Sequence, residues 1–495
     1  MMRLSNATLT QLPASVLRPA YDRNTLATGI VHLGIGAFHR AHQAVYTEAA
    51  LAAGDRRWGI LGASLRSLDT RDALAPQDGL YTVATRDAAG ERLQVVGAVT
   101  RLLAGNNGEL CAAMASPDVR IVSLTITEKG YCRAANGGLD PAHPDISYDL
   151  THPHTPRSAP GVVIEALRRR RDAGLPAFTV LCCDNLPANG RTVHGVLRDL
   201  ASLHDPALAR WVEDTVRCPS TMVDRIVPAT TNADRASIAT SLGLIDAWPV
   251  VTEPFSQWVI EDSFGAGRPD WDASGANFVA DVAPFELAKL RMLNGAHSAL
   301  AYLGYLAGCA TVAETMAMPG FCEYVRGLML DEAAPTLRAV PGLNLTAYAD
   351  SLLGRFRNPA LHHRTWQIAM DGSQKLPQRL LGTVQGRLAT GASFGRLALA
   401  VAAWMRFVGG VDEQGRPIDV QDPMAAVLRV RATRSPGASP AAIVAGLLGI
   451  EAIFGTVLPA HDGFRSALEA ALTSLMRLGA AATVAGFAGE TTHAV

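Results

Sequence analysis

A lysine, an asparagine and a histidine lie close together in an otherwise apolar run, Lys289–His297 (KLRMLNGAH). The flanking segments are rich in Leu, Ala and Met, so the sequence predicts a helix here. At about 100° per residue in an α-helix, Asn294 and His297 fall on the same side as Lys289. Glu286, about one turn earlier, joins this polar stripe. Burying such groups is costly unless each has a partner, so the stripe is either a functional surface or a solvent-facing face with a satisfied histidine.

These side chains suit the oxidation of a secondary alcohol. If a hydride leaves such a carbon, one group must take the hydroxyl proton and another must stabilise the developing alkoxide charge. Lys289 can serve as the base, because desolvation and nearby cations lower the pKa of a lysine. Arg291 and a protonated His297 are the candidate cations, and asparagine amides can stabilise an alkoxide without adding charge.

A glycine-rich turn near the N-terminus predicts a nucleotide-binding element. Ile30–Leu33 is a short apolar strand, Gly34 and Gly36 form a tight turn, and Phe38–Ala53 has helical character. Strand, glycine turn and helix together aim backbone N–H groups at a pyrophosphate. The third glycine of the usual fingerprint is absent. No Tyr-x-x-x-Lys follows the turn and no histidine–cysteine–acid cluster resembles the zinc site of medium-chain alcohol dehydrogenases, so we expect no metal.

The second strand of this unit would be followed by an acidic residue suited to a ribose. Trp58–Ala63 is predicted to be that strand, at βαβ spacing, and Asp69 comes after it. An acid in this region can hydrogen-bond both hydroxyls of an adenosine ribose and repels a 2′-phosphate, which favours NAD. Arg66 nearby would soften that preference. Asp69 could instead cap the next helix.

Further apolar strands are predicted at Val119–Thr127 and Ala177–Cys183, with a helix between them at Gly161–Ala173. Both end in polar segments, EKGY and DNLPANG, where an open α/β sheet binds its ligands. Thr221–Pro228 and Val251–Asp262 continue the alternation. Beyond about residue 280 strand signals nearly vanish and helical patterns dominate. We therefore predict an α/β Rossmann-like domain, residues 1–280, and a mostly α-helical substrate and catalytic domain, residues 281–495, opened by the Lys289 helix.

The composition excludes several kinds of partner. Lys and Arg number 44 against 45 Asp and Glu, and the one basic cluster, Arg168–Arg171, suits a solvated helix face, so we expect no nucleic acid. Seven cysteines without a CxxC pair suit reduced thiols in a cytoplasmic protein. The N-terminus lacks the apolar core of a signal peptide, and no segment has about 18 uninterrupted apolar residues, so no membrane is expected.

The catalytic motif and several others occur in an order that resembles a known family. The spacing of Lys289, Asn294 and His297, together with HLGIGAFHRAHQ, SLTITEKGYC, CDNLPANG, MVDRIVP and EPFSQWVIED, is similar to that of the polyol-specific long-chain dehydrogenases. The resemblance runs from about residue 28 to beyond 460. It implies a Rossmann-like domain, a helical C-terminal domain and NAD-dependent hydride transfer without a metal, in a monomer or weak homo-oligomer.

The resemblance also implies roles for individual residues. Lys289 matches the general base, Glu286 a glutamate that passes its proton to solvent, and His297 the histidine that orients the substrate. The remaining catalytic positions are the two asparagines of an oxyanion hole, Asn185 and Asn294, and the aspartate beside the histidine, Asp224. The matched cofactor positions and their neighbours are Gly34, Gly36, Phe38, Arg66, Asp69 and Glu128. Taken singly, Asn185 could be a turn residue and Asp224 a helix cap or buried ion pair.

The substrate class depends on one motif in the helical domain. Mannitol dehydrogenases of the family place an arginine eight positions before the lysine of DGSxK, where this chain has Gln367 and DGSQK. Arg364, Lys375 and Arg379 instead resemble the fructuronate reductase branch, and arginine pairs a carboxylate through two parallel hydrogen bonds. We therefore expect a sugar acid, D-mannonate/D-fructuronate, with the neutral polyols mannitol or arabinitol as the alternative. The arginines could instead bind helix carbonyls or surface acids, and a non-catalytic nucleotide sensor is a further alternative.

Overall fold

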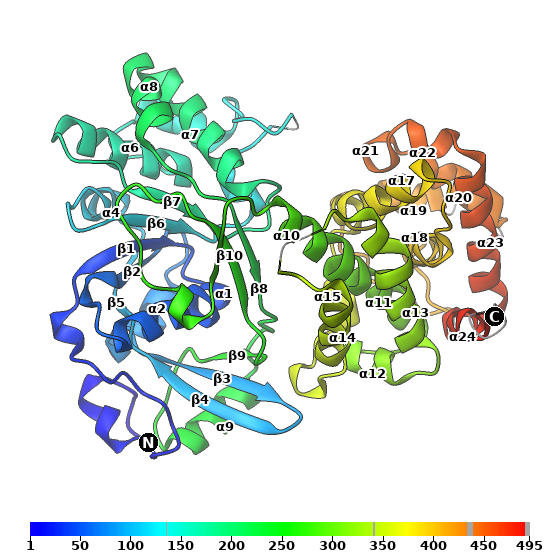
Figure 1. Cartoon of the computed structure of the whole chain (residues 1–495), viewed down its shortest axis with the longest axis horizontal. Coiled ribbons are helices and arrows are strands. Elements are labelled where there is room, and N and C mark those ends of the chain that lie inside the picture. The colour runs from blue at the N-terminus through cyan, green and yellow to red at the C-terminus, as the bar shows by residue number, and fades with distance from the viewer. Residues whose placement is uncertain (135, 340–341, 433–438, 491–495) are drawn as a thin grey trace. The chain divides into compact units, whose positions relative to one another are not determined.

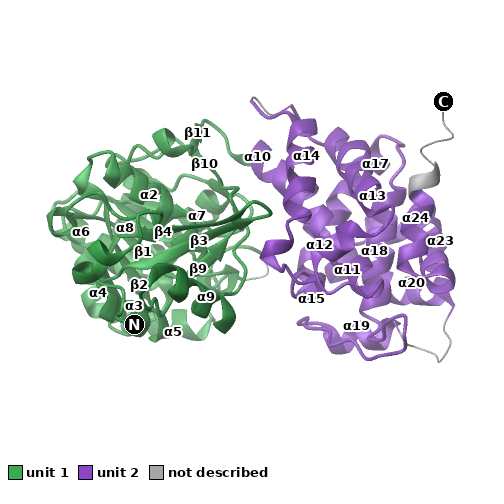
Figure 2. Ribbon diagram, turned by 90° about the horizontal axis from the view of Figure 1, so that it is seen from below, with its two compact units in different colours: residues 1–283 green, residues 284–495 purple. Residues whose placement is uncertain are grey.

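The computed structural model describes residues 1–134, 136–339, 342–432 and 439–490. The chain divides into two compact units, Met1–Ala283 and Pro284–Val495 (Figures 1 and 2). The first unit contains the strands and the second is helical. The predicted fold classes, α/β and then mostly α-helical, are therefore confirmed.

The first unit is built on a five-stranded parallel sheet with the order β5-β2-β1-β6-β7. Its strands are β1 (Thr28–Leu33), β2 (Gly59–Ser64), β5 (Val99–Ala104), β6 (Ile121–Leu124) and β7 (Thr179–Cys182). The chain runs outward from β1 through β2 to β5, and then returns to the other side of β1 with β6. The strand order therefore reverses at β1 and β6, and the crevice beyond their carboxyl ends is where such sheets bind ligands.

Both faces of this sheet are buried by apolar side chains. Val31 and Leu61 belong to a core shared with the helices α4 (Asn107–Met114), α6 (Ala159–Asp172) and α7 (Asn189–His204). Ile30 and Ile60 point to the other core, which contains α2 (Gln43–Ala52) and three buried tryptophans. Two buried faces explain why the strands are almost continuously apolar in the sequence.

Six further strands and five short or outlying α-helices also belong to the unit. They form the sheets β4-β3-β9 and β11-β10-β8, from β3 (Tyr81–Asp87), β4 (Gly90–Val96), β8 (Thr221–Asp224), β9 (Val250–Thr252), β10 (Gln257–Glu261) and β11 (Asn277–Val279). The helices are α1 (Ala37–Ala41), α3 (Asp69–Leu74), α8 (Pro206–Thr215) and α9 (Asn232–Leu242), with α5 (Pro144–Thr151) before α6. The hairpin β3–β4 was not predicted. The expected single run Val251–Asp262 is two strands of different sheets, because Pro254 between them cannot donate to a ladder.

The arginine cluster differs from the expected solvated face. Arg170 is buried and donates to the main-chain carbonyls of Pro176, Ser116 and Val119. The other three arginines pair with acids of unit 1, namely Glu165, Asp172 and Asp205. The cluster is thus used within the fold, and its charge is largely neutralised.

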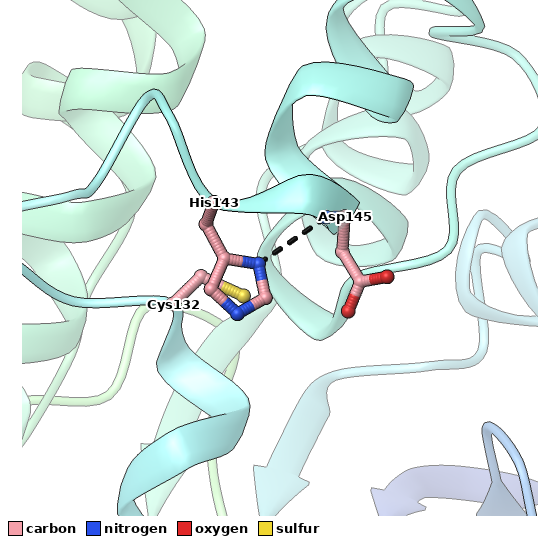
Figure 3. A group of neighbouring side chains, drawn as sticks. All are labelled: Cys132, His143 and Asp145. Carbon is pink, nitrogen blue, oxygen red and sulfur yellow. Dashed lines mark hydrogen bonds between the residues drawn. The ribbon is translucent and has the colours of Figure 1, made fainter.

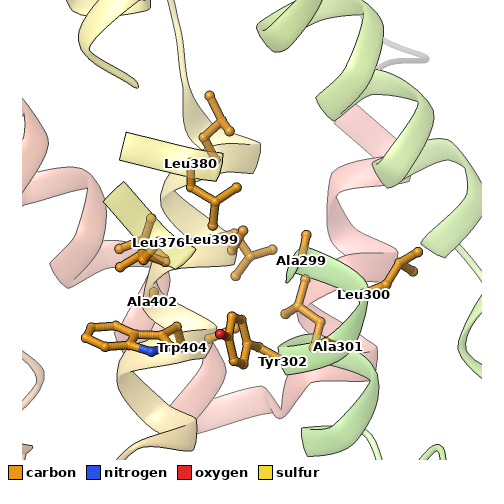
Figure 4. Packing of buried hydrophobic residues seen from close by; sticks show 14 of the residues in the cluster. Ala299, Leu300, Ala301, Tyr302, Leu376, Leu380, Leu399, Ala402 and Trp404 are labelled. Atoms are coloured by element: carbon orange, nitrogen blue, oxygen red, sulfur yellow. The ribbon is translucent and has the colours of Figure 1, made fainter. Parts of the chain in front are cut away.

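The second unit packs its helices around α11 (Gly295–Leu306) and α18 (Gly395–Phe407), whose contact is filled by Tyr302, Trp404 and aliphatic side chains (Figure 4). The other main helices are α10 (Ala283–Ala288), α12 (Val312–Ala317), α13 (Phe321–Gly327), α14 (Leu345–Phe356), α15 (Thr365–Ala369), α16 (Gly372–Leu376), α17 (Gly382–Ala389), α19 (Ala425–Ala432), α20 (Pro440–Leu448), α21 (Glu451–Phe454), α22 (Val457–Ala460), α23 (Asp462–Leu478) and α24 (Ala480–Glu490). Within the described ranges, no helix combines the length and apolarity needed to cross a membrane.

The helix that carries the lysine is not a regular α-helix. Between α10 and α11 the chain forms a π-helical turn, η7 (Lys289–Asn294). Two more π-helical turns, η8 (Leu328–Ala333) and η11 (Pro377–Leu381), contact it. A π-turn accommodates an additional residue through i→i+5 hydrogen bonds, so the directions calculated at about 100° per residue do not apply across it. Such turns occur frequently at functional sites.

Candidate active site

The glycine turn after β1 requires a glycine at its first position. Gly34 has φ +95°, and a Cβ there would lie 2.0 Å from the carbonyl oxygen of Thr125, at the end of β6. The absence of a side chain therefore keeps the ends of β1 and β6 close together. Gly36 has φ −81° and is the N-cap of α1, so no steric need of this kind applies to it. The expected helix Phe38–Ala53 is broken at His42 into α1 and α2.

A buried histidine supports this turn and was not singled out from the sequence. His32 Nδ1 lies 2.8 Å from Ser123 Oγ, and Nε2 lies 3.1 Å from the carbonyl oxygen of Gly34. Its ring stacks on His39 at a centroid distance of 3.4 Å. Burial lowers the pKa of His32 to about 3, so the ring is neutral and can donate to Gly34 and accept from Ser123. The sequence signal that could have identified it is a histidine inside an apolar strand, in the segment HLG.

A cavity of about 540 Å³ opens at the carboxyl ends of β1, β2 and β6. Gly34, Ser64–Ser67 and Thr125–Thr127 line it, together with the basic residues Lys129 and Arg157. Ser158, the N-cap of α6, also lines it and turns the positive end of a long helix toward it. A basic wall at the strand-order reversal suits a ligand that carries phosphate groups.

Only some of the predicted cofactor positions line this cavity. Gly34 and Arg66 do, and the predicted positions outside the lining are Gly36, Phe38, Asp69 and Glu128. Asp69 lies exposed in the first turn of α3 and accepts a hydrogen bond from Ser67 Oγ at 2.9 Å. Phe38 stacks on His42 at 4.9 Å. Lys129 and Arg157 contribute to the wall instead, and the sequence analysis did not choose either one.

Asn185 is exposed in the turn after β7, and its neighbours fix that turn. The half-buried carboxylate of Asp184 accepts hydrogen bonds from the main-chain N–H groups of Ile126 and Thr127, at 2.9 and 3.1 Å, and from the Tyr131 hydroxyl at 2.7 Å. Asn189 Nδ2 donates to the carbonyls of Cys182, Asp184 and Thr221 at 2.9–3.2 Å. These bonds join the ends of β6, β7 and β8, so the turn that presents Asn185 is rigid.

Asp224 is the last residue of β8 and is buried. It stands opposite Gln257 in the antiparallel pair β8–β10. The strand position makes the helix-cap alternative wrong. Asn185 and Asp224 thus belong to the first unit, whereas the lysine stripe belongs to the second.

The stripe in the second unit does not face solvent. Lys289 and His297 are buried, at 8% and 7% exposure, and Glu286 and Asn294 are half-buried. The solvent-facing interpretation is therefore wrong for the two buried residues. Arg291 Nη1 donates to the carbonyl of Thr336 at 2.9 Å.

His297 is neutral, which corrects the expected imidazolium. Its ring lies 4.7 Å from Phe356 and 5.2 Å from His363, measured between ring centroids. Burial first, and then the charges of His363, Arg355, Arg379 and Lys289, hold its pKa well below the usual range. Its Nε2 is buried and has no hydrogen-bond partner among the residues that the structure describes. A buried nitrogen in this state is available to a substrate hydroxyl.

The three basic residues expected to bind a carboxylate differ in position. Arg379 lies on η11 and packs against α11. Its carbonyl oxygen would be 3.0 Å from a Cβ added to Gly295, and its Nη1 is 3.4 Å from Ser298 Oγ. Lys375 Nζ donates to the carbonyls of Ile368 and Met370, at 3.4 and 2.5 Å. Arg364 is the exposed N-cap residue of α15. Arg379 is thus the one packed along the helix that carries His297.

A parallel sheet whose crevice is lined by basic side chains, followed by a helical unit with a buried lysine and histidine, suits a dinucleotide-dependent oxidoreductase. Family comparisons identify residues 28–273 as a mannitol dehydrogenase Rossmann domain and residues 281–476 as a mannitol dehydrogenase C-terminal domain. The chain belongs to the mannitol dehydrogenase family, whose members are oxidoreductases acting on CH–OH groups.

Individual relatives cover nearly the whole chain. D-mannonate oxidoreductase of Escherichia coli is 50% identical over 478 residues, covering 95% of this chain and 98% of that protein. Mannitol 2-dehydrogenase of Phaeosphaeria nodorum is 40% identical over 496 residues, covering 98% and 86%. The structure of Pseudomonas fluorescens mannitol 2-dehydrogenase in a ternary complex with NAD and D-mannitol has a TM-score of 0.89 and 41% identity, covering 99% of this chain and 100% of that one.

Proposed function

We propose that this protein is an NAD-dependent oxidoreductase that interconverts D-mannonate and D-fructuronate without a catalytic metal. The observation that carries the proposal is a set of polar side chains inside the second unit. A buried lysine shares its helix with a neutral histidine that has an unused nitrogen, and a basic side chain packs along that helix. These are the groups that a hydroxylated, anionic substrate needs.

The cavity of the first unit supports NAD as the cofactor. Gly34 lines it without a side chain, so the backbone there can approach a pyrophosphate closely. Lys129 and Arg157 supply positive charge for the phosphates. When bound, NAD would accept the hydride in oxidation and NADH would return it in reduction.

Side chains of the protein would transfer the proton of the reacting hydroxyl and stabilise the charge on its oxygen. Lys289 takes the proton of the reacting hydroxyl as the carbon–hydrogen bond breaks, and returns it to the oxygen in reduction. Asn185 and Asn294 would donate hydrogen bonds to the developing alkoxide oxygen and so stabilise its charge. His297 and Asp224 would orient neighbouring hydroxyls, and Glu286 would pass the lysine's proton to solvent.

The acid substrate is supported by Arg379. A guanidinium can hold a carboxylate through two parallel hydrogen bonds, whereas Lys375 is already bound to the carbonyls that end α15. The relative named D-mannonate oxidoreductase, at 50% identity, supports the same choice. The alternative is a neutral polyol, mannitol or arabinitol, since relatives named mannitol 2-dehydrogenase are 40% identical.

We also propose a cytoplasmic location, because seven free thiols are typical of a protein in a reducing compartment. We further propose that the protein is a monomer or a weak homo-oligomer.

The direct experiment compares NADH oxidation with D-fructuronate and with D-fructose, at neutral pH and without added metal. A large preference for fructuronate in kcat/KM is expected, because only that substrate offers a carboxylate to Arg379. A preference for fructose would refute the acid substrate and leave the enzyme a mannitol 2-dehydrogenase. Turnover of neither, with NADH still bound, would favour a nucleotide sensor.

A further inference from the structure

Three potential metal ligands from two segments meet in the wall of the first unit's cavity. Cys132, His143 and Asp145 place one ligand atom each within 4.8 Å of one another (Figure 3). All three line the cavity at the carboxyl ends of β1, β2 and β6. The sequence analysis found no histidine–cysteine–acid cluster, because the ligands are separated by a loop. The proposed mechanism uses none of them.

Backbone contacts set this arrangement. Cys132 directly follows the short helical turn Glu128–Tyr131 and has φ +52°, a left-handed conformation that is costly for a side-chain-bearing residue. Its carbonyl accepts the N–H of Asp140 at 2.8 Å, which returns the chain toward it. His143 caps α5, and Asp145 lies in the first turn of that helix. The cluster is therefore positioned by the fold.

The donor set selects the kind of ion. Thiolate, imidazole and carboxylate together suit Zn²⁺, whereas Mg²⁺ and Ca²⁺ prefer oxygen ligands alone. Three protein ligands leave one tetrahedral position, and because all three line the cavity, that position faces it. A zinc ion held here would stand in space that a ligand of the cavity also needs.

Existing contacts of the cluster would oppose binding only weakly. Arg66 pairs with Asp145, but the Arg66 side chain is 79% exposed and such surface pairs contribute little. His143 Nδ1 accepts the main-chain N–H of Asp145 at 3.2 Å, and a metal on the ring would replace or reset this long bond. The buried Cys132 thiol must release its proton on binding. These costs favour reversible rather than permanent occupancy.

We propose that Cys132, His143 and Asp145 bind a zinc ion, and that bound zinc weakens the binding of the dinucleotide in the same cavity. The second half rests on the proposed function, because it takes NADH as the ligand of the cavity. Coupling between two ligands is reciprocal, so NADH weakens zinc binding by the same factor. The site regulates access to the cavity and takes no part in hydride transfer.

Metal binding is tested on the tag-free full-length protein with Co²⁺ as the probe. A thiolate-to-cobalt charge-transfer band that saturates at one equivalent and disappears on adding Zn²⁺ is expected. Cys132→Ser should abolish the band and His143→Ala should weaken Co²⁺ binding at least tenfold. Cys218→Ser, a half-buried cysteine of the same unit outside the cluster, should leave both unchanged. Arg66→Ala should tighten binding, because it removes the competitor for Asp145.

Absence of the band, or a Cys132→Ser variant that binds Co²⁺ as the natural chain does, would overturn the site. The coupling is tested by titrating NADH, followed by its fluorescence, with and without one equivalent of Zn²⁺. We expect the NADH Kd to rise at least fivefold in the natural chain and to stay constant in Cys132→Ser. A constant Kd in both would overturn the antagonism. If NADH binds under neither condition, the antagonism and the proposed function fail together, and the cobalt band alone decides the zinc site.

Discussion

Replacing Gly34 with alanine tests whether the turn after β1 holds the nucleotide crevice together. The added Cβ would lie 2.0 Å from the carbonyl oxygen of Thr125, far inside ordinary contact, and the obstacle is backbone that cannot rotate away. The variant can relieve the overlap only by moving β1 and β6 apart. That movement would stretch the hydrogen bonds from Thr125 N to the Leu33 carbonyl, 2.9 Å, and from Thr125 Oγ1 to the Gly34 carbonyl, 2.7 Å.

The cost can be built from these parts. An alanine at φ +95° carries roughly 1–3 kcal/mol of backbone strain. Each lost hydrogen bond adds about 1 kcal/mol. The free energy of unfolding should therefore fall by about 3–5 kcal/mol, and NADH binding should weaken more than tenfold because the crevice is distorted.

Urea unfolding followed by circular dichroism, and NADH titration followed by fluorescence, measure the two effects. Gly36→Ala is the matched control, since its Cβ would meet nothing closer than 3.7 Å and its φ is −81°. We expect that variant to change the free energy of unfolding by less than about 0.5 kcal/mol. The reasoning is refuted if Gly34→Ala keeps the unfolding midpoint and the NADH affinity of the natural chain.

Three other predictions concern the site. Lys289→Ala should lose nearly all turnover while NADH binding is unchanged, as judged by steady-state rates beside fluorescence titration; a variant that keeps most of its rate would exclude lysine as the base. Arg379→Ala should lower kcat/KM for fructuronate about 10²-fold, near 3 kcal/mol, with little effect on kcat/KM for fructose. Replacing the exposed Arg364 with alanine should change kcat/KM for neither substrate. Equal losses on both substrates in Arg379→Ala would refute the carboxylate role. The folded-state pKa of His32, about 3, lies below the unfolded value of about 6.5, so only the unfolded chain gains a proton as pH falls below 6.5, and by pH 4.5 this residue should cost about 3 kcal/mol of stability. His32→Asn should therefore reduce the dependence of the unfolding free energy on pH, measured by urea unfolding at several pH values in that range. An unchanged pH dependence would contradict the assignment.

The strands and helices that the sequence predicted well are those with one dominant pattern. The parallel strands are buried on both faces, so their apolar runs were visible, and the glycine turn was visible from its composition. The hairpin Tyr81–Val96 has mixed polarity and a turn without the usual Asn-Gly signal, so it escaped. Val119–Thr127 was predicted too long because its last residues leave the strand to line the cavity.

The candidate site residues likewise divide into those that a local sequence pattern reveals and those that only the fold brings together. Lys289, Asn294 and His297 could be chosen because their spacing is local. Lys129, Arg157 and the Cys132 cluster could not, since only the fold brings them to one wall. The neutral state of His297 also depends on burial that no local pattern shows.

The π-helical turn at Lys289–Asn294 has a practical consequence for anyone who would transplant this chemistry. A designer who copied the lysine, asparagine and histidine at their native spacing onto a regular α-helix would reproduce the sequence motif, but the side chains would point in the wrong directions. The graft must include the widened turn, and the turn in turn contacts η8 and η11, which are widened as well. The smallest portable unit of this site is therefore three packed turns rather than a nine-residue motif.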